Sequence, residues 1–382
     1  MSIRSSYTVL GWLLVAMLLL SACRPVQPRD TPPADAGTAT DQELAAQLDT
    51  LLTRLGQEGL FHGAVLVARS GNTVLHKGYG LADRERAIAH TPGTRFRIAS
   101  ITKQFTALAI MMLQEQGKLH VYDNVCQYLP ECPTGWENMT IHHLLTHTSG
   151  IFDLRNWAYT GQKPEPSTSA QVIEDLMAQP LQFTPGTRFS YTNGGFMVAA
   201  YIVEQVAGQP YADFLQENIF EPLGMHDTGY ANDATSLAVG YRNDTAAESL
   251  IDGSRPYGAA GLYSTVDDMY SYLRALESGR LVSQKSLDAL TNGHMPMGAD
   301  NGFFTPTYEQ PSYYGYGWAV STYKDHRMYG HDGWIEGYGG DIRRFPDDDI
   351  TIILLMNLSE PYAATIGDQI VETMFANSAA QN

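Results

Sequence analysis

The chain has 382 residues, of which 44% are hydrophobic and 17% are charged. This length can bury a sizeable core in one large domain or two interleaved ones, and the apolar content excludes a disordered chain. With 24 basic against 41 acidic residues, the formal net charge is −17, which argues strongly against a nucleic-acid partner. Three cysteines are too few for a disulfide-dense scaffold.

The first 22 residues have the layout of an export signal. One basic residue, Arg4, precedes an uncharged stretch over residues 5–22 with an apolar centre. A permanent membrane helix is the alternative, because a stretch of this length is borderline for spanning a bilayer. Leu20-Ser21-Ala22-Cys23 is similar to the lipobox of bacterial lipoproteins, which implies that residues 1–22 are a signal peptide and that Cys23 becomes lipidated. We therefore expect a protein of the bacterial cell envelope, anchored in the membrane through Cys23 and facing the periplasm or the exterior.

Residues 23–41 are rich in Pro, Ala, Thr and Asp without apolar periodicity, which predicts a flexible tether before a folded domain over residues 42–376. Residues 377–382 are expected to be a C-terminal tail. Cys126 and Cys132 could form a disulfide in an exported protein, or remain reduced as two small hydrophobic residues.

Hydrophobic periodicity predicts, in chain order, a helix over 41–59, a hairpin over 63–83 and a helix over 100–116. The stretch 120–290 is mostly helix and loop, with its clearest helices at 170–179, 194–207, 211–219 and 265–278. Strands return at 315–322, 327–329, 339–345 and 350–357, before a closing helix over 365–376. Strands at both ends favour an α/β fold of the α+β type, with one antiparallel sheet formed by both termini, flanked by helices, and a mostly helical insertion.

Ser100-Ile101-Thr102-Lys103 is a Ser-x-x-Lys motif at the start of the helix predicted over 100–116. Residues i and i+3 share one face of a helix, so the Ser100 hydroxyl and the Lys103 amine can meet. The positive helix N-terminus and partial burial favour an uncharged amine, which can take the proton of the hydroxyl and activate it as a nucleophile. Ser321 and Lys324 have the same spacing, but they fall in a strand pattern, where residues i and i+3 lie on opposite faces.

Two further segments carry polar groups suited to a cleft. Tyr191-Thr192-Asn193 precedes a predicted helix, so its hydroxyl and amide could both project into one site; simple packing is the alternative, since the chain has 22 tyrosines. His331-Asp332-Gly333 lies in a Gly-rich strand region, where a glycine lets a substrate backbone approach closely. An ordinary histidine at a sheet edge is the alternative there.

In this order, Ser-x-x-Lys, Tyr-x-Asn and His-x-Gly resemble the three motifs of the serine penicillin-recognising superfamily. The resemblance is to the branch that holds class C β-lactamases, D-Ala-D-Ala carboxypeptidases, D-amino-acid peptidases and related esterases, and it covers about residues 42–376. The segments 143–150, 185–186, 222–225, 258–262 and 315–318 also resemble that branch. The resemblance implies a β-lactamase/transpeptidase-like fold.

The resemblance also implies a role for each motif residue. Ser100 would be the acylated nucleophile and Lys103 its base partner. Tyr191 would pass the proton to the leaving group and later activate water, while Asn193 would hold the substrate amide. No metal and no cofactor is implied.

The third motif would contribute the remaining groups. His331, Asp332 and Gly333 would bind substrate, and the backbone N–H groups of Ser100 and Trp334 would form the oxyanion hole. Such donors contribute about 10²–10³ in rate apiece.

Two departures from the family pattern narrow the expected substrate. His331 stands where many relatives carry Lys, and histidine is neutral or only partly charged near pH 7. Asp332 replaces a hydroxyl residue, and its side chain would repel a substrate carboxylate if it faced the cleft. We therefore expect an ester, a neutral amide or a substrate with an amino group in preference to a β-lactam or a free D-Ala terminus. Nearby aromatic residues could line an apolar acyl pocket or pack in a surface loop: Phe303, Phe304, Tyr308, Tyr313, Tyr314 and Tyr316.

Other hydrolase classes fit less well. The Gly-x-Ser-x-Gly elbow of an α/β-hydrolase is absent, and so is His-Glu-x-x-His, which would indicate a zinc site near His142, His143 and His147. The sequence predicts a serine hydrolase that forms an acyl-enzyme on the amide or ester bond of a small-molecule or peptide substrate, of the penicillin-binding-protein/DD-peptidase or esterase type. A class C-like β-lactamase and a non-catalytic binding lipoprotein on the same fold remain as alternatives.

Overall fold

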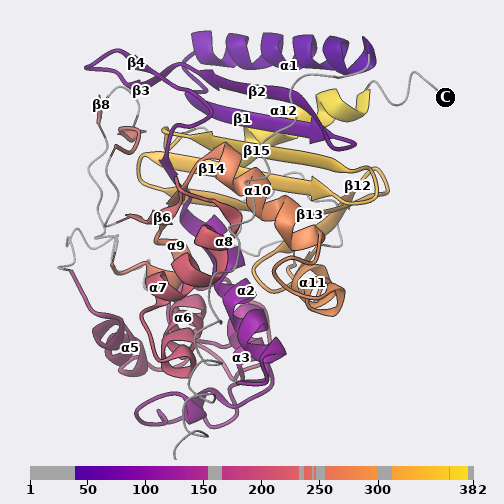
Figure 1. Ribbon diagram of the computed structural model, residues 1–382. Helices are drawn as coiled ribbons and strands as arrows, with labels where there is room; N and C mark the ends of the chain where they lie inside the picture. Colours follow the sequence, from indigo (N-terminus) through magenta and orange to yellow (C-terminus); the bar gives the residue numbers. More distant parts are fainter. Residues whose placement is uncertain are drawn as a thin grey trace, which may run out of the picture.

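The computed structural model describes residues 39–153, 166–231, 236–242, 245–246, 254–298, 312–360 and 362–376. Within these ranges the chain forms an antiparallel sheet of eight strands flanked by helices, with a mostly helical region beside it (Figure 1). No helix in these ranges is long and apolar enough to cross a membrane. The predicted signal peptide and Cys23 lie outside the described residues.

The main sheet combines strands from both ends of the chain, as the sequence predicts. β1, near the N-terminus, pairs with β15, near the C-terminus, and all neighbouring strands are antiparallel. Both are buried almost throughout, which accounts for their continuous apolar sequences. In order across the sheet the strands are β10 (Met295–Pro296), β11 (Tyr313–Tyr314), β12 (Ala319–Tyr323), β13 (His326–Ile335), β14 (Tyr338–Phe345), β15 (Ile350–Met356), β1 (Gly63–Arg69) and β2 (Asn72–Tyr79).

The predicted strand over 315–322 is wrong in its extent, and the strand expected at 327–329 continues to Ile335 as β13. The sequence predicts a single strand over 315–322, whereas a tight turn separates β11 from β12. In this turn the Gly315 N–H donates to the Trp318 carbonyl at 2.7 Å, and Gly317 has a φ of +77°. A Cβ at position 317 would lie 2.7 Å from the Lys103 carbonyl oxygen. Gly317 therefore allows the turn to pack against the start of the helix that carries Lys103. Such a long-range contact leaves no mark on the strand periodicity of the sequence.

Helices cover both faces of the sheet, and two adjacent arginines of β14 mark the two sides. Arg343 points to α12 (Ala363–Ala376), where it pairs with Asp368, and α1 (Ala39–Gln57) packs beside α12 on that face. Arg344 points the other way and pairs with Glu277 at the end of α10 (Val266–Glu277). Alternation along β14 therefore assigns α12 and α10 to opposite faces.

The helical region lies on the α10 side of the sheet (Figure 1). Its predicted helices occur within a few residues of their expected ranges, except that α7 continues as a π-helical turn. The helical elements here are η1 (Ala99–Ile101), α2 (Thr102–Glu115), η2 (Val125–Gln127), α3 (Ile141–Leu145), α5 (Ser169–Met177), α6 (Asn193–Ala207), α7 (Tyr211–Leu215), η3 (Gln216–Phe220), α8 (Glu221–Leu223), α9 (Tyr257–Ala260) and α11 (Gln284–Thr291). The remaining short strands form small sheets outside the main one: β3 (Leu81–Asp83), β4 (Ile88–Ala89), β5 (Phe96–Arg97), β6 (Gly229–Tyr230), β7 (Tyr241–Arg242), β8 (Thr245–Ala246) and β9 (Leu262–Ser264).

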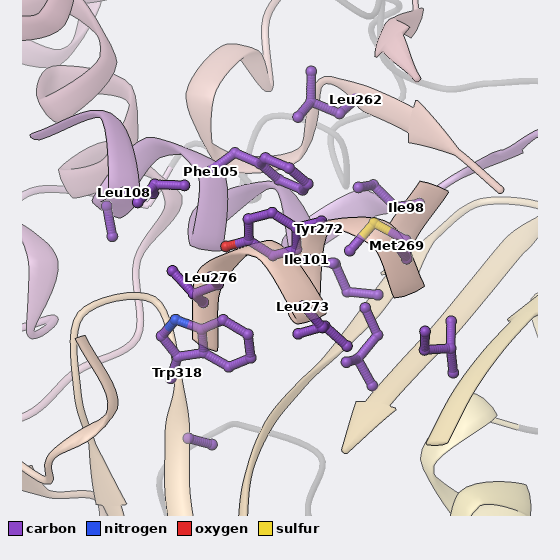
Figure 2. Close-up of a cluster of buried hydrophobic side chains, with 14 of the residues drawn as sticks. Ile98, Ile101, Phe105, Leu108, Leu262, Met269, Tyr272, Leu273, Leu276 and Trp318 are labelled. Carbon is purple, nitrogen blue, oxygen red and sulfur yellow. The ribbon is translucent and has the colours of Figure 1, made fainter. Parts of the chain in front are cut away.

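A buried cluster joins the helical region to α10 and the sheet (Figure 2). Ile98 and Phe105 flank the Ser-x-x-Lys motif, and both are fully buried. The Phe105 ring lies 4.3 Å from the ring of Tyr272 in α10, between ring centroids. Burying such side chains contributes roughly 1.5–3 kcal/mol each. The segment that carries Ser100 is thus fixed by core packing on both sides of the motif.

Candidate active site

Ser100 lies in η1, a single turn between β5 and α2. The preceding residue, Ala99, has a φ of +46°, a left-handed conformation that costs roughly 1–2 kcal/mol for a residue with a Cβ. Ile98 donates its N–H to the Leu262 carbonyl at 3.0 Å, and Ile101 donates to the Ile98 carbonyl at 3.1 Å. These bonds and the surrounding core hold the strained turn, a combination that is frequent at functional sites.

The structure brings together the four polar residues that the first two motifs supply. Ser100 Oγ lies 3.1 Å from Lys103 Nζ and accepts a hydrogen bond of 2.9 Å from the Tyr191 hydroxyl. Lys103 is fully buried, and its Nζ also donates to Asn193 Oδ1 at 2.8 Å and to the Ala259 carbonyl at 2.9 Å. Nucleophile and base within hydrogen-bond reach are what nucleophilic catalysis requires.

The Tyr-x-Asn segment is positioned by the start of α6. Thr192 is the N-cap, and its side chain accepts from the Gly194 N–H at 3.1 Å. Asn193 is therefore the first helical residue, with its side chain directed at Lys103. At position 195 a Cβ would lie 3.0 Å from the Leu144 carbonyl, so Gly195 lets α6 approach α3 closely.

His331 is buried on β13 and has no charge to offer a substrate. Its Nδ1 lies 2.6 Å from the Asp332 carbonyl oxygen, so Nδ1 carries the ring proton and donates it there. Nε2 then accepts from the Tyr314 hydroxyl at 2.9 Å. Burial, reinforced by the charge of Lys103, lowers the pKa of His331 to about 3. The fold therefore favours the neutral form of the His331 ring more strongly than the ordinary pKa of histidine does.

Asp332 does not face the nucleophile, which corrects its expected role in substrate binding. In the β13–β14 register Asp332 lies directly opposite Asp341, so the two side chains share a sheet face. Asp341 accepts from Arg343, which also pairs with Asp368 of α12. The Asp332 carboxylate is thus buried on the α12 face, because successive residues of a strand point to opposite sides.

Gly333 is required by the protein's own backbone. A Cβ at this position would overlap the Ile98 carbonyl oxygen and lie 3.4 Å from the Ala99 Cβ. The sequence attributes this glycine to the approach of a substrate, whereas the structure shows it in contact with η1. This contact brings β13 beside the nucleophile segment. Ser100 and Trp334, whose N–H groups are the expected oxyanion hole, therefore come from adjacent segments.

The other residues predicted from the sequence are two cysteines, a group of aromatic residues and a second Ser-x-x-Lys pair. Cys126 and Cys132 form a disulfide. Of the predicted aromatic pocket, Tyr314 is buried against the site and Tyr316 bonds to His142, while Phe303, Phe304 and Tyr308 lie outside the described residues. The second Ser-x-x-Lys is not a motif in space: Ser321 lies in β12, and Lys324 follows it with its Nζ over the Tyr323 ring.

Three contributors to the site were not assigned a role in it from the sequence. The Ala259 carbonyl binds Lys103, and Asp153 Oδ1 lies 3.5 Å from Asn193 Nδ2. His147 is fully buried with its ring 4.2 Å from the Tyr191 ring. Ala259 and His147 lie in segments that resemble the family, and Asp153 follows one of them, so the sequence indicated the segments. The contacts of the individual residues depend on long-range packing and could not be predicted from the sequence.

Comparisons with known proteins agree with this geometry. The Beta-lactamase family model matches residues 48–374. Penicillin-binding protein 4* of Bacillus subtilis is 29% identical over 84% of this chain and 73% of its own length. Esterase EstB of Burkholderia gladioli is 29% identical over 77% of this chain and 87% of its own length. The octameric penicillin-binding protein homologue from Pyrococcus abyssi superposes with a TM-score of 0.74 at 27% identity, covering 88% of this chain and 77% of that one.

The match spans most of the chain and includes the strands at both ends and the helices between them. It therefore covers the whole arrangement that positions Ser100, Lys103 and Tyr191. The chain belongs to the Beta-lactamase family of serine hydrolases.

Proposed function

We propose that this protein hydrolyses ester or neutral amide bonds through an acyl-enzyme on Ser100. The observation that carries the proposal is the position of Ser100 Oγ, 3.1 Å from Lys103 Nζ and 2.9 Å from the Tyr191 hydroxyl. An otherwise weak nucleophile is activated by an adjacent base of this kind. The similarity to an esterase and to a penicillin-binding protein supports the same bond types.

The proposed reaction has two halves. Lys103 accepts the Ser100 proton as Oγ attacks the carbonyl carbon, and the N–H groups of Ser100 and Trp334 stabilise the oxyanion. The proton passes through the Tyr191 hydroxyl to the leaving alcohol or amine as its bond to the carbonyl breaks. Water then attacks the acyl carbon and gives its proton to the Tyr191–Lys103 pair. The bond between the acyl carbon and Ser100 Oγ breaks, the pair returns the proton to Oγ, and the acid is released.

The neutral His331 supports the choice of substrate. A cation at the third motif would attract a substrate carboxylate, but both ring nitrogens of His331 are hydrogen bonded and its burial disfavours the charged form. From the sequence, Asp332 was also expected to disfavour substrates with a carboxylate. The Asp332 side chain faces α12, however, and does not contribute to this preference. Esters and neutral amides therefore suit the site better than substrates that need a carboxylate partner. A class C-like β-lactamase is the second candidate, favoured by the family match alone.

Kinetics with a panel of substrates tests this proposal. We expect hydrolysis of p-nitrophenyl esters and of D-amino-acid amides at a kcat/KM well above that for nitrocefin, penicillin G or a D-Ala-D-Ala peptide. Ser100→Ala should abolish all turnover, while the matched variant Ser321→Ala should retain it. A kcat/KM for penicillin or nitrocefin above that for every ester and amide would support the β-lactamase instead.

We also propose that Cys23 is the lipid anchor of an envelope protein, on the basis of the lipobox-like segment 20–23. The full chain expressed in a bacterial host should incorporate radiolabelled palmitate and partition with membranes. Cys23→Ser should abolish both, whereas Cys132→Ser, at a cysteine of the folded domain, should leave the label in place. Palmitate incorporation that persists in Cys23→Ser would contradict the anchor.

A further inference from the structure

His147 binds the segment around Tyr191 with both its backbone carbonyl and its side chain. Its carbonyl oxygen accepts from the Ser190 N–H at 2.9 Å, and its Nδ1 accepts from the Thr192 N–H at 3.2 Å. One residue thus holds the backbone immediately before and immediately after Tyr191. Because Nδ1 is the acceptor, the neutral ring carries its proton on Nε2.

The His147 ring also supports the Tyr191 ring directly. The two ring centroids lie 4.2 Å apart with an interplanar angle of 37°. His147 is fully buried, and the rings of Tyr314 and Phe196 pack on it at 4.5 and 5.1 Å. The backbone of His147 has a φ of +56°, which is unfavourable for a residue with a Cβ. The fold therefore maintains a strained residue whose ring packs on Tyr191 and whose carbonyl binds the preceding Ser190 N–H.

The geometry points to His147 as a positioning residue that holds the Tyr191 hydroxyl in line with Ser100 Oγ. This inference rests on the proposed function, in which Tyr191 carries the proton to the leaving group. A tyrosine ring has few internal rotations, so the place of its hydroxyl is set by its backbone and by whatever packs on the ring. His147 contacts both the ring and the adjoining backbone. A displacement of about 1 Å at such a group can cost about 10²-fold in rate.

The inference predicts a loss that depends on the leaving group. Ethyl butyrate releases a poor leaving group that needs its proton, whereas p-nitrophenyl butyrate releases a good one. His147→Gly, which fits the left-handed backbone but removes the ring, should lower kcat/KM for the ethyl ester by about 10²-fold and for the p-nitrophenyl ester by less than about tenfold. His147→Asn keeps an acceptor near the Nδ1 position and tolerates positive φ, so it should restore much of the loss.

A matched histidine and a double-mutant cycle separate positioning from general packing. His143 makes the same kind of bond, with Nδ1 accepting from the Thr140 N–H at 3.2 Å, so His143→Gln should leave the ratio of the two esters unchanged. In a Tyr191→Phe background, His147→Gly should cause no further loss for the ethyl ester, because the group it positions is gone. If the Gly variant does not fold, His147→Gln should lose activity where His147→Asn retains it, since Gln carries its amide further from Thr192.

Equal losses for both esters, or an undiminished loss in the Tyr191→Phe background, would overturn the inference. The same holds if Asn performs no better than Gly or Gln at equal thermal stability. Phosphonate labelling of Ser100 distinguishes these failures from failure of the proposed function. A labelled, active wild type with an additive cycle rejects the role of His147 alone, while an unlabelled and inactive wild type rejects both.

Discussion

Asp332 of β13 lies directly opposite Asp341 of β14, and both carboxyl groups are buried on the α12 face. Burial, together with the neighbouring Asp341, raises the pKa of Asp332 to about 8 from its ordinary value of 3.8. Arg343 and Asp368 complete the charges of this cluster, and Lys103 also acts on Asp332 from the other side. Burial and the excess of negative charge in the cluster therefore make the folded protein hold the Asp332 proton to a higher pH than the unfolded chain does.

This shift predicts how stability changes with pH. Between about pH 4 and 8 the unfolded chain releases the Asp332 proton while the folded chain keeps it. The contribution of Asp332 to stability therefore falls as pH rises, by about 1.4 kcal/mol per pH unit within that window. Asp332→Asn removes this penalty, so the stability gained over wild type should grow from pH 5 to pH 8. Urea unfolding at each pH measures it, with exposed Asp347→Asn as the control; a gain independent of pH would contradict the prediction.

Arg343 compensates the two other buried carboxylates of the cluster. It donates to Asp341 and pairs with Asp368, each at 2.7 Å, while only 2% of its side chain is exposed. Arg343→Met leaves both carboxylates without their cation and should destabilise the protein by about 3–5 kcal/mol. Arg54→Ala, which breaks an exposed pair with Glu58, should cost only about 0.3–0.5 kcal/mol. Denaturant titration of both variants tests the contrast, and a loss below about 1 kcal/mol for Arg343→Met would refute it.

Adding a single methyl group at Gly333 is expected to change the activity. In Gly333→Ala the new Cβ collides with the Ile98 carbonyl, so η1 and Ser100 must shift relative to β13. We expect acylation of Ser100 to slow by about 10²-fold. Gly93→Ala is the matched control, because its Cβ would meet nothing closer than Thr91 Oγ1 at 3.9 Å. Stopped-flow acylation rates compare the two, and equal rates would show that the contact has no influence on the site.

The strands at both ends of the chain and the meeting of Ser100 with Lys103 were predictable, because they depend on local periodicity. Residues three apart on one helical turn must share a face, which is enough to bring Ser100 and Lys103 together. The approach of Tyr191 and Asn193 came from the family resemblance, and their spacing alone would not have placed them beside Ser100. Strand alternation separates His331 from Asp332, but only the register with β14 shows which of them faces the nucleophile.

Other features were not predictable from local patterns. The turn at 315–318 depends on the packing of Gly317 against Lys103, and the role of Gly333 depends on the distant Ile98. His147 is one of several histidines in its segment, and nothing in the spacing distinguishes it. Its contacts require residues 190–192 to return to it, which is a property of the whole fold.

The chemistry assigned to the serine itself is most directly tested by intact-protein mass spectrometry after incubation with a fluorophosphonate. We expect one adduct on the wild type, located at Ser100 by peptide mapping, and none on Ser100→Ala. Lys103→Met should slow labelling by at least about 10²-fold, because the amine that activates the hydroxyl is removed. Ser321→Ala should be labelled like the wild type. An adduct that persists in Ser100→Ala, or a folded wild type that is never labelled, would contradict the assignment of Ser100 as the nucleophile.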